Sequence, residues 1–329
     1  MPRAIRIAET GGPEQLYVDE VALQEPGPGE VRLRQHVCGV NFIDCYFRNG
    51  LYPLPHLPHG IGVEASGEVE AIGEGVAEVA VGDRVAYATP PPGAYAESRV
   101  MPAERLVPVP AGIPDDVAGG TLLRGLTAWY LLHRTHVLRR GETILVHAAA
   151  GGVGLLLCQW AEALGATVIG TVGDEDKAQR AAENGCHHPI VYTRDAFRDK
   201  VASITGERGV DVVYDSVGAV TFHDSLDCLR PRGLLVTYGN ASGPPPAIEP
   251  GLLAKKGSLF LTRPTLFDYV SERDELLEGA NAYFDAIAQG MLDPQIGRRY
   301  PLDKAAEAHR SLEGRQTTGA TLLDLAAGG

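Results

Sequence analysis

The chain has 329 residues, a length that predicts about two domains, and it carries a formal net charge of −13 at pH 7. Hydrophobic residues make up 44% and charged residues 22% of the sequence, which argues against a disordered or collagen-like chain. The acidic balance disfavours nucleic acid and anionic membranes as partners. The first residues, MPRAIRIAETGG, lack the apolar segment of a secretory signal, and the five cysteines form no C-x-x-C pair. We therefore expect a cytoplasmic protein that binds neither nucleic acid nor membranes.

The first part of the chain is rich in turn residues, since 14 of the 23 prolines precede position 125. Its segments are short, alternate in hydropathy or carry β-branched residues, and are closed by Gly, Pro or Asp. Examples are EVRLRQHVCGV (30–40), GVEASGEVEAIG (62–73) and DRVAYA (83–88). This pattern predicts a β-rich first domain.

Strand patterns alternate with helical patterns in the next part of the chain. Strands are expected at residues 143–149, 167–172, 189–193, 210–217, 233–239 and 258–263. Six strands alternating with helices predict an α/β domain at 125–265, a six-stranded doubly wound parallel sheet of the Rossmann type. Residues 271–290 have apolar residues at helical spacing and acidic residues near their start, which predicts a helix. We expect it to return the chain to the first domain, which then comprises 1–124 with 266–329.

A glycine-rich loop, His147-Ala-Ala-Ala-Gly-Gly-Val-Gly154, follows the first of these strands. Small residues between a strand and a helix let backbone N–H groups and the helix N-terminus approach a pyrophosphate, so the loop predicts dinucleotide binding. The alternative is a tight turn that serves only helix packing. The uncharged run from Thr143 to Ala161 is long enough for a membrane span, but its central glycines favour strand, turn and helix.

The end of the second strand bears on the choice between NAD and NADP. An acidic residue there would bind the ribose hydroxyls of NAD. The strand instead ends in the small, neutral run Gly170 to Gly173, and Lys177 follows one turn into the next helix, which favours a 2′-phosphate. Asp174 is the alternative ribose ligand, but we interpret it and the two acidic residues after it as first-turn helix acids. The expected cofactor is NADPH.

Taken together, these motifs resemble the medium-chain dehydrogenase/reductase superfamily, and most closely its NADPH:quinone oxidoreductases related to ζ-crystallin. The matching stretches are VNFIDCYFRNGLYP (40–53), GVEASGEVEAIGEGV (62–76), GDRVAY (82–87), GAYAE (93–97), GLTAWYLL (125–132), HAAAGGVG (147–154), YDSVG (214–218) and KGSLFLTRP (256–264). The resemblance implies a GroES-like catalytic domain beside the NADPH-binding domain, and a homodimer.

The resemblance also concerns zinc. Zinc-dependent alcohol dehydrogenases of this superfamily place a catalytic Cys and a G-H-E His where this chain has Asn41 and Val63. An amide is a poor zinc ligand and valine is none, and the four-cysteine structural lobe is absent from the sequence. We therefore expect no metal, and reduction of an already electrophilic acceptor rather than oxidation of an alcohol.

The resemblance implies the residues of the site as well. Asn41, Tyr46 and Tyr52 are expected at the substrate, where a tyrosine ring stacks on a quinone and Asn41 or a tyrosine hydroxyl binds its carbonyl oxygen. Ordinary half-buried packing is the alternative for the tyrosines, and Asp44 is interpreted as a cap of the following helical turn. The expected cofactor contacts are Thr127, Ala149, Ala150, Gly151, Gly152, Val153, Gly154, Gly173, Lys177, Tyr192, Ser216, Tyr238, Gly239, Asn240, Arg263 and Arg315.

The function predicted from this resemblance is metal-free reduction of a quinone, or a similar conjugated carbonyl, by NADPH. Reduction of the C=C bond of an enal or enone is the alternative within enzymes. A non-catalytic NADPH-binding protein of the crystallin type is the alternative of another class.

Overall fold

The structure is a computed structural model that describes residues 1–325, and its chain divides into two compact units. The β-rich unit comprises Met1–Leu126, Val270–Ala288 and the chain from Pro294 on, and the α/β unit comprises Thr127–Tyr269 with Gln289–Asp293. The sequence predicts one domain at 1–124 with 266–329 and another at 125–265. This division into compact units does not test those limits, which remain a prediction. Among residues 1–325 no helix is long and apolar enough to cross a membrane.

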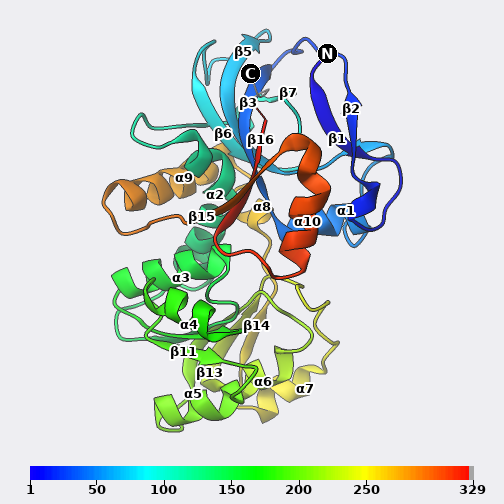
Figure 1. Cartoon of the computed structure of the whole chain (residues 1–329). Helices are drawn as coiled ribbons and strands as arrows, with labels where there is room; N and C mark the ends of the chain where they lie inside the picture. Colours follow the sequence, from blue (N-terminus) through cyan, green and yellow to red (C-terminus); the bar gives the residue numbers. More distant parts are fainter. Residues whose placement is uncertain (326–329) are drawn as a thin grey trace. The chain divides into compact units, whose positions relative to one another are not determined.

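The α/β unit contains a six-stranded parallel sheet in the order β11-β10-β9-β12-β13-β14 (Figure 1). Its strands are β9 (Thr143–Val146), β10 (Thr167–Val172), β11 (His188–Val191), β12 (Val210–Asp215), β13 (Leu229–Thr237) and β14 (Phe260–Thr262). Its helices are α3 (Gly152–Ala163), α4 (Glu175–Ala182), α5 (Phe197–Thr205), α6 (Phe222–Asp227), α7 (Pro250–Lys255) and α8 (Leu266–Tyr269). All six predicted strands and the fold class are confirmed.

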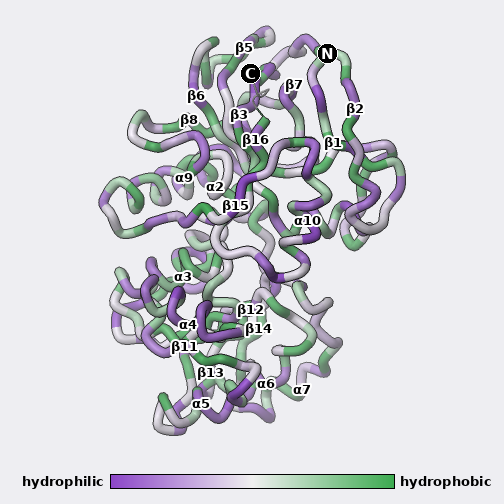
Figure 2. Tube along the Cα trace, viewed as in Figure 1, coloured by the Kyte–Doolittle hydropathy of each residue, from purple (hydrophilic) through white to green (hydrophobic). Residues whose placement is uncertain are grey.

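Burial explains why these segments are strands. Every residue of β12 is buried, and Figure 2 shows a hydrophobic run along β13, as expected for strands covered on both faces. The first strand ends at Val146, earlier than predicted, because Ala148 takes a positive φ of 53° and turns the chain. The strand order reverses between β9 and β12, and open α/β sheets bind ligands at the carboxyl ends of the strands at such a switch point.

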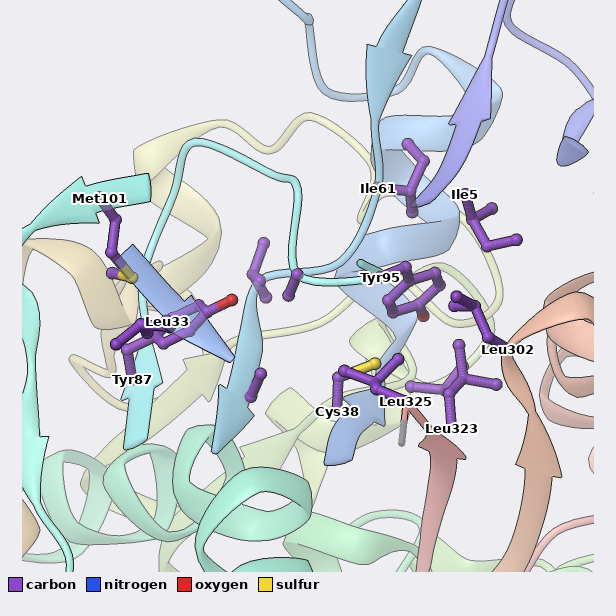
Figure 3. Packing of buried hydrophobic residues seen from close by; sticks show 14 of the residues in the cluster. Ile5, Leu33, Cys38, Ile61, Tyr87, Tyr95, Met101, Leu302, Leu323 and Leu325 are labelled. Atoms are coloured by element: carbon purple, nitrogen blue, oxygen red, sulfur yellow. The ribbon is translucent and has the colours of Figure 1, made fainter. Parts of the chain in front are cut away.

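The β-rich unit has two sheets. Strands β2 (Tyr17–Glu20), β1 (Arg3–Ile7) and β4 (His59–Gly60) form one of them. The other has the order β15-β16-β3-β5-β6-β8, with β7 paired to β3, from β15 (Ile296–Pro301), β16 (Ala320–Asp324), β3 (Glu30–Val40), β5 (Glu64–Ile72), β6 (Arg84–Ala88), β8 (Val107–Pro108) and β7 (Ser98–Pro102). Figure 3 shows part of the core on this sheet, where Cys38 of β3 lies opposite Leu323 of β16.

Four helices of this unit bear on the site: α1 (Phe42–Asn49), α2 (Asp115–Tyr130), α9 (Arg273–Ala288) and α10 (Ala305–Glu313). The predicted helix at 271–290 is confirmed as α9. It packs on the part of α2 that belongs to this unit, because Tyr283 hydrogen-bonds Thr121 at 2.7 Å and its ring lies against Gly125, where a Cβ would come within 2.5 Å. The α2 helix itself continues past Leu126 into the α/β unit.

Candidate active site

Asn41 occupies the N-cap position of α1, directly after β3. Its backbone N–H donates to Oδ2 of Asp44 at 2.8 Å, and the two residues form a capping box. The interpretation of Asp44 as a helix cap is thus confirmed. Asp44 is fully buried, and burial raises the pKa of its carboxyl to about 7 against the opposing effect of hydrogen bonds from Asn41 and Tyr95.

Asn41 is only 5% exposed, and its side chain binds a second buried carboxylate, Glu64. Asn41 Nδ2 donates to Glu64 Oε1 at 2.7 Å, and the backbone N–H of Leu123 donates to Glu64 Oε2 at 2.8 Å. Arg124 Nη1 lies 3.9 Å from Glu64 Oε1. Burial raises the pKa of Glu64, while Arg124 and the two hydrogen bonds oppose that shift. Sequence reasoning missed Glu64, although it stands in the Gly62-Val63-Glu64 run that bears on the missing zinc ligand.

Tyr46 and Tyr52 lie together. Their ring centroids are 5.4 Å apart in an edge-to-face arrangement, and the N–H of Tyr52 donates to the Tyr46 carbonyl at 3.0 Å. Phe42 and Phe47 contact these tyrosines, with centroid distances of 6.4 Å to Tyr46 and 5.7 Å to Tyr52. The structure therefore gathers all three predicted substrate residues on α1 and the loop after it. Their roles toward a substrate stay predictions.

A buried chain of hydrogen bonds continues from Asp44, and sequence reasoning missed it. Tyr95 Oη donates to Asp44 Oδ2 at 2.8 Å and lies 3.1 Å from His309 Nε2. Arg48 Nη1 lies 3.0 Å from His309 Nδ1. A guanidinium only donates, so Nδ1 accepts, Nε2 carries the proton and donates to Tyr95, and His309 is neutral. Burial, with Arg48 beside it, lowers the pKa of His309 to about 3. These groups come from distant parts of the chain, so no local pattern could reveal them.

The glycine-rich loop begins the α/β unit's candidate cofactor site. Gly151 is the N-cap of α3, and in the described part of the chain no side chain caps that helix. Gly154 packs against the loop so closely that a Cβ there would lie 2.3 Å from the Ala148 carbonyl oxygen. The open N–H groups of the first turn and this close approach are what a pyrophosphate requires. Ala149, Ala150, Gly152 and Val153 belong to the same loop and first turn.

His147, the first residue of this loop, is held by buried hydrogen bonds that the sequence did not reveal. It is fully buried, with Nδ1 2.8 Å from Thr171 Oγ1 and Nε2 2.9 Å from Ser225 Oγ. The N–H of Ala149 donates to the Thr171 carbonyl at 3.0 Å, so β10 holds both the histidine and the loop. Burial lowers the pKa of His147, which keeps the ring neutral.

The residues after β10 lie as predicted for a helix start. Asp174 is the N-cap of α4, and its carboxylate accepts from the Lys177 N–H at 2.8 Å. Lys177 Nζ lies 3.3 Å from the same carboxylate. Tyr192, which is 44% exposed, lies beside Gly173, where a Cβ would come within 3.2 Å of its hydroxyl. Gly173, Lys177 and Tyr192 are thus neighbours at the end of β10.

Most of the remaining predicted cofactor residues lie in one cluster, and two of them, Thr127 and Arg315, lie apart from it. Gly239 packs against the Ser216 carbonyl, and the Tyr238 N–H donates to Asp215 O at 2.8 Å. Arg263 Nη1 donates to the Thr237 carbonyl at 2.9 Å, and its Nη2 lies 3.2 Å from the Asn240 amide oxygen. These residues follow β12, β13 and β14. Thr127 lies buried in α2, and Arg315 lies exposed after α10 in the β-rich unit.

Residues 1–325 contain no group of three or more His, Cys, Asp or Glu side chains that could hold a metal ion. All five cysteines are buried and unpaired in disulfides.

Comparisons with known proteins agree on the family. A family model described as an alcohol dehydrogenase GroES-like domain matches residues 27–111, and one described as a zinc-binding dehydrogenase matches residues 152–278. The chain is 50% identical over 323 residues to a quinone oxidoreductase of Pseudomonas aeruginosa, covering 98% of this chain and 99% of that protein. It is 48% identical over 331 residues to a 2-haloacrylate reductase of a Burkholderia species, with the same coverage.

Among solved structures, the quinone oxidoreductase of Escherichia coli in complex with NADPH matches with a TM-score of 0.96 and 44% identity, covering 98% of this chain and 99% of that chain. The quinone oxidoreductase of Pseudomonas syringae matches with a TM-score of 0.97 and 45% identity, covering 98% and 100%. With these relatives, this fold and this arrangement of residues, the chain belongs to the quinone oxidoreductases of the medium-chain dehydrogenase/reductase superfamily.

Proposed function

We propose that the protein is an NADPH-dependent reductase that passes a hydride, or the equivalent electrons, to quinones without a metal. The observation that carries the proposal is Asn41, which stands where zinc-dependent members of the superfamily carry a metal ligand. Its side-chain amide donates to the buried carboxylate of Glu64, and its backbone N–H donates to that of Asp44. The similarity to quinone oxidoreductases over 98% of the chain supports it.

The α/β unit fits NADPH. The uncapped first turn of α3 and the glycine loop suit its pyrophosphate, and Lys177 with Tyr192 suits its adenosine phosphate. Thr127, Ser216, Asn240, Arg263 and Arg315 are further proposed contacts. When bound, NADPH supplies the hydride from its nicotinamide ring.

In the β-rich unit, we assign the substrate to Asn41, Tyr46 and Tyr52. Asn41 donates a hydrogen bond to the acceptor carbonyl as negative charge develops on its oxygen, which stabilises the transition state more than the ground state. Tyr46 and Tyr52 meet edge to face, so the face of one tyrosine ring is proposed to stack on a planar acceptor. The proton that completes reduction comes from water or a tyrosine hydroxyl.

The test is whether the purified protein oxidises NADPH in the presence of 1,4-benzoquinone. The decrease in NADPH absorbance measures the rate. We expect quinone-dependent turnover and a lower KM for NADPH than for NADH. Stoichiometric NADPH binding without turnover of any acceptor would instead support the non-catalytic, crystallin-type alternative.

A second candidate is reduction of an activated C=C bond, and the 48% identity to a 2-haloacrylate reductase favours it specifically. A 2-alkenal and 2-chloroacrylate assayed beside benzoquinone separate the two. A kcat/KM higher for either alkene than for the quinone would assign the protein to the second candidate. The homodimer and the cytoplasmic location also remain proposals, testable by light scattering and by cell fractionation.

A further inference from the structure

Glu64 is a fully buried carboxylate that the proposed reaction does not yet use. It begins β5 and points at three donors: Asn41 Nδ2 at 2.7 Å, the Leu123 N–H at 2.8 Å and Arg124 Nη1 at 3.9 Å. Burying a carboxylate is costly unless each oxygen finds a donor, so this arrangement calls for a reason beyond packing.

The fold makes room for this carboxylate. Gly39 lies opposite on β3, and a Cβ at that position would come within 2.0 Å of Glu64 Oε1. Arg124 is itself held in place, since its guanidinium donates to the carbonyls of Val40 at 2.8 Å and Gly120 at 2.5 Å. Glu64 therefore has a fixed position between β3 and α2, within the β-rich unit.

The partners of Glu64 decide which way the Asn41 amide faces. A carboxylate can only accept, so the nitrogen of the amide must be the atom that faces Glu64. The capping box directs the amide oxygen toward the first turn of α1. The second hydrogen of Nδ2 is then what Asn41 offers to a ligand. Asn41 is held as a donor.

We infer that Glu64 is a positioning residue that fixes Asn41 as a hydrogen-bond donor toward the carbonyl oxygen of the acceptor. The inference rests on the proposed function. It also bears on the substrate class, because a fixed donor stabilises acceptors that gain negative charge on oxygen during reduction, such as quinones and enones.

The substitution Glu64→Gln cannot reproduce this arrangement. A glutamine amide has one accepting and one donating end, but Asn41 on one side and Leu123 on the other both donate. Either orientation of the new amide sets one donor against another, and turning the Asn41 amide over would remove its donor from the ligand. Gly39→Ala disturbs the same contact without changing a polar group, because its methyl displaces the Glu64 carboxylate.

The experiment compares Glu64→Gln and Gly39→Ala in the native background and in an Asn41→Ala background, with benzoquinone as the acceptor. We expect kcat to fall by about 10- to 100-fold in the native background, less than the roughly 100- to 1,000-fold cost of removing an oxyanion donor. The KM for NADPH should change by no more than about twofold. In the Asn41→Ala background neither change should lower kcat further.

The matched control is Glu97→Gln, which removes a carboxylate in the same unit that binds Arg3 rather than Asn41. It should keep the native kcat. Native turnover in both Glu64→Gln and Gly39→Ala, or an equal loss with and without Asn41, would overturn the inference. If Glu64→Gln does not fold, Gly39→Ala decides.

A measurement on the unmodified protein separates this inference from the proposed function. The side-chain amide signal of Asn41 in a ¹H–¹⁵N spectrum is identified as the one missing in Asn41→Ala. A hydrogen bond to a carboxylate should shift one of its protons strongly downfield. An ordinary amide shift overturns the inference even if the enzyme is active. A downfield proton in a protein that turns over no acceptor overturns only the function.

Discussion

The candidate sites of the two units differ in whether backbone or side-chain groups compose them. In the α/β unit the groups proposed to bind the cofactor are mainly backbone N–H groups of one continuous loop, whose glycines pack closely. In the β-rich unit the proposed hydrogen-bond donor is one side chain, Asn41, which lies among buried charged residues from β5, α1 and α2. The first site should be sensitive to added atoms near the glycines, and the second to the direction in which Asn41 donates.

The largest effect should come from adding one methyl group to the glycine loop. In Gly154→Ala the Cβ would lie 2.3 Å from Ala148 O and 2.9 Å from the Ala149 backbone, so α3 must shift. We expect a loss of stability of about 1–3 kcal/mol and a loss of NADPH affinity of at least about 100-fold, measured by thermal unfolding and fluorescence titration. Gly251→Ala in α7, where a Cβ meets nothing within 4 Å, is the control and should bind NADPH normally.

Removing the charge of Asp44 should change how the stability of the β-rich unit depends on pH. Asp44 Oδ2 accepts both hydrogen bonds of that carboxylate, and Oδ1 has no partner among residues 1–325. In Asp44→Asn the amide oxygen can keep both bonds. Because the folded-state pKa of about 7 exceeds the ordinary 3.8, the folded protein binds the proton more tightly. Asp44 therefore reduces stability as the pH rises from about 4 to 7.

We expect Asp44→Asn to gain stability over the native protein across this window, by on the order of a few kcal/mol at pH 8 and little at pH 4. Urea unfolding at both pH values measures the difference. His309 contributes in the opposite sense, since its pKa of about 3 lies below the ordinary 6.5 and its stabilisation is lost as the pH falls. Because His309 is present in both proteins, its contribution cancels when their unfolding free energies are subtracted. A pH-independent difference would contradict the assignment.

Removing the donor should spare the cofactor. Asn41→Ala should lower kcat with benzoquinone by about 100-fold, and Tyr46→Phe should lower it less, while the NADPH dissociation constant stays unchanged in both. Normal turnover in both variants would remove these residues from the substrate site. A large change in NADPH affinity would contradict the assignment of Asn41 and Tyr46 to the substrate rather than to the cofactor.

The smallest effect concerns the choice of cofactor. Lys177→Ala should weaken NADPH binding by about tenfold and leave NADH binding unaltered, because only NADPH carries the extra phosphate. Asp174→Ala removes the cap of α4 and should affect both cofactors alike. Unchanged NADPH binding in the first variant, with weaker NADH binding in the second, would make Asp174 the ribose ligand instead.

The contrast between the units also explains what could be predicted from the sequence. The six parallel strands and the loop from His147 to Gly154 were predictable because hydrophobic runs, turns and glycines are local signals. The resemblance placed Asn41, Tyr46 and Tyr52 together, and the structure gathers them on α1 and the loop after it. Glu64 and His309 were not predictable, because a buried polar residue is defined by distant partners: Asn41 lies 23 residues from Glu64, and Arg48 lies 261 residues from His309.

The position of β16 has a consequence for how the chain acquires its structure during synthesis. This strand, Ala320–Asp324, lies between β15 and β3 in the sheet of the β-rich unit. The β3 strand is synthesised early, but it can pair with β16 only after the end of the chain has been synthesised. Most of the α/β unit is encoded without interruption, by Thr127–Tyr269. We expect the cofactor-binding unit to fold on the ribosome first, while the strand that leads to Asn41 stays incompletely paired until the last residues emerge.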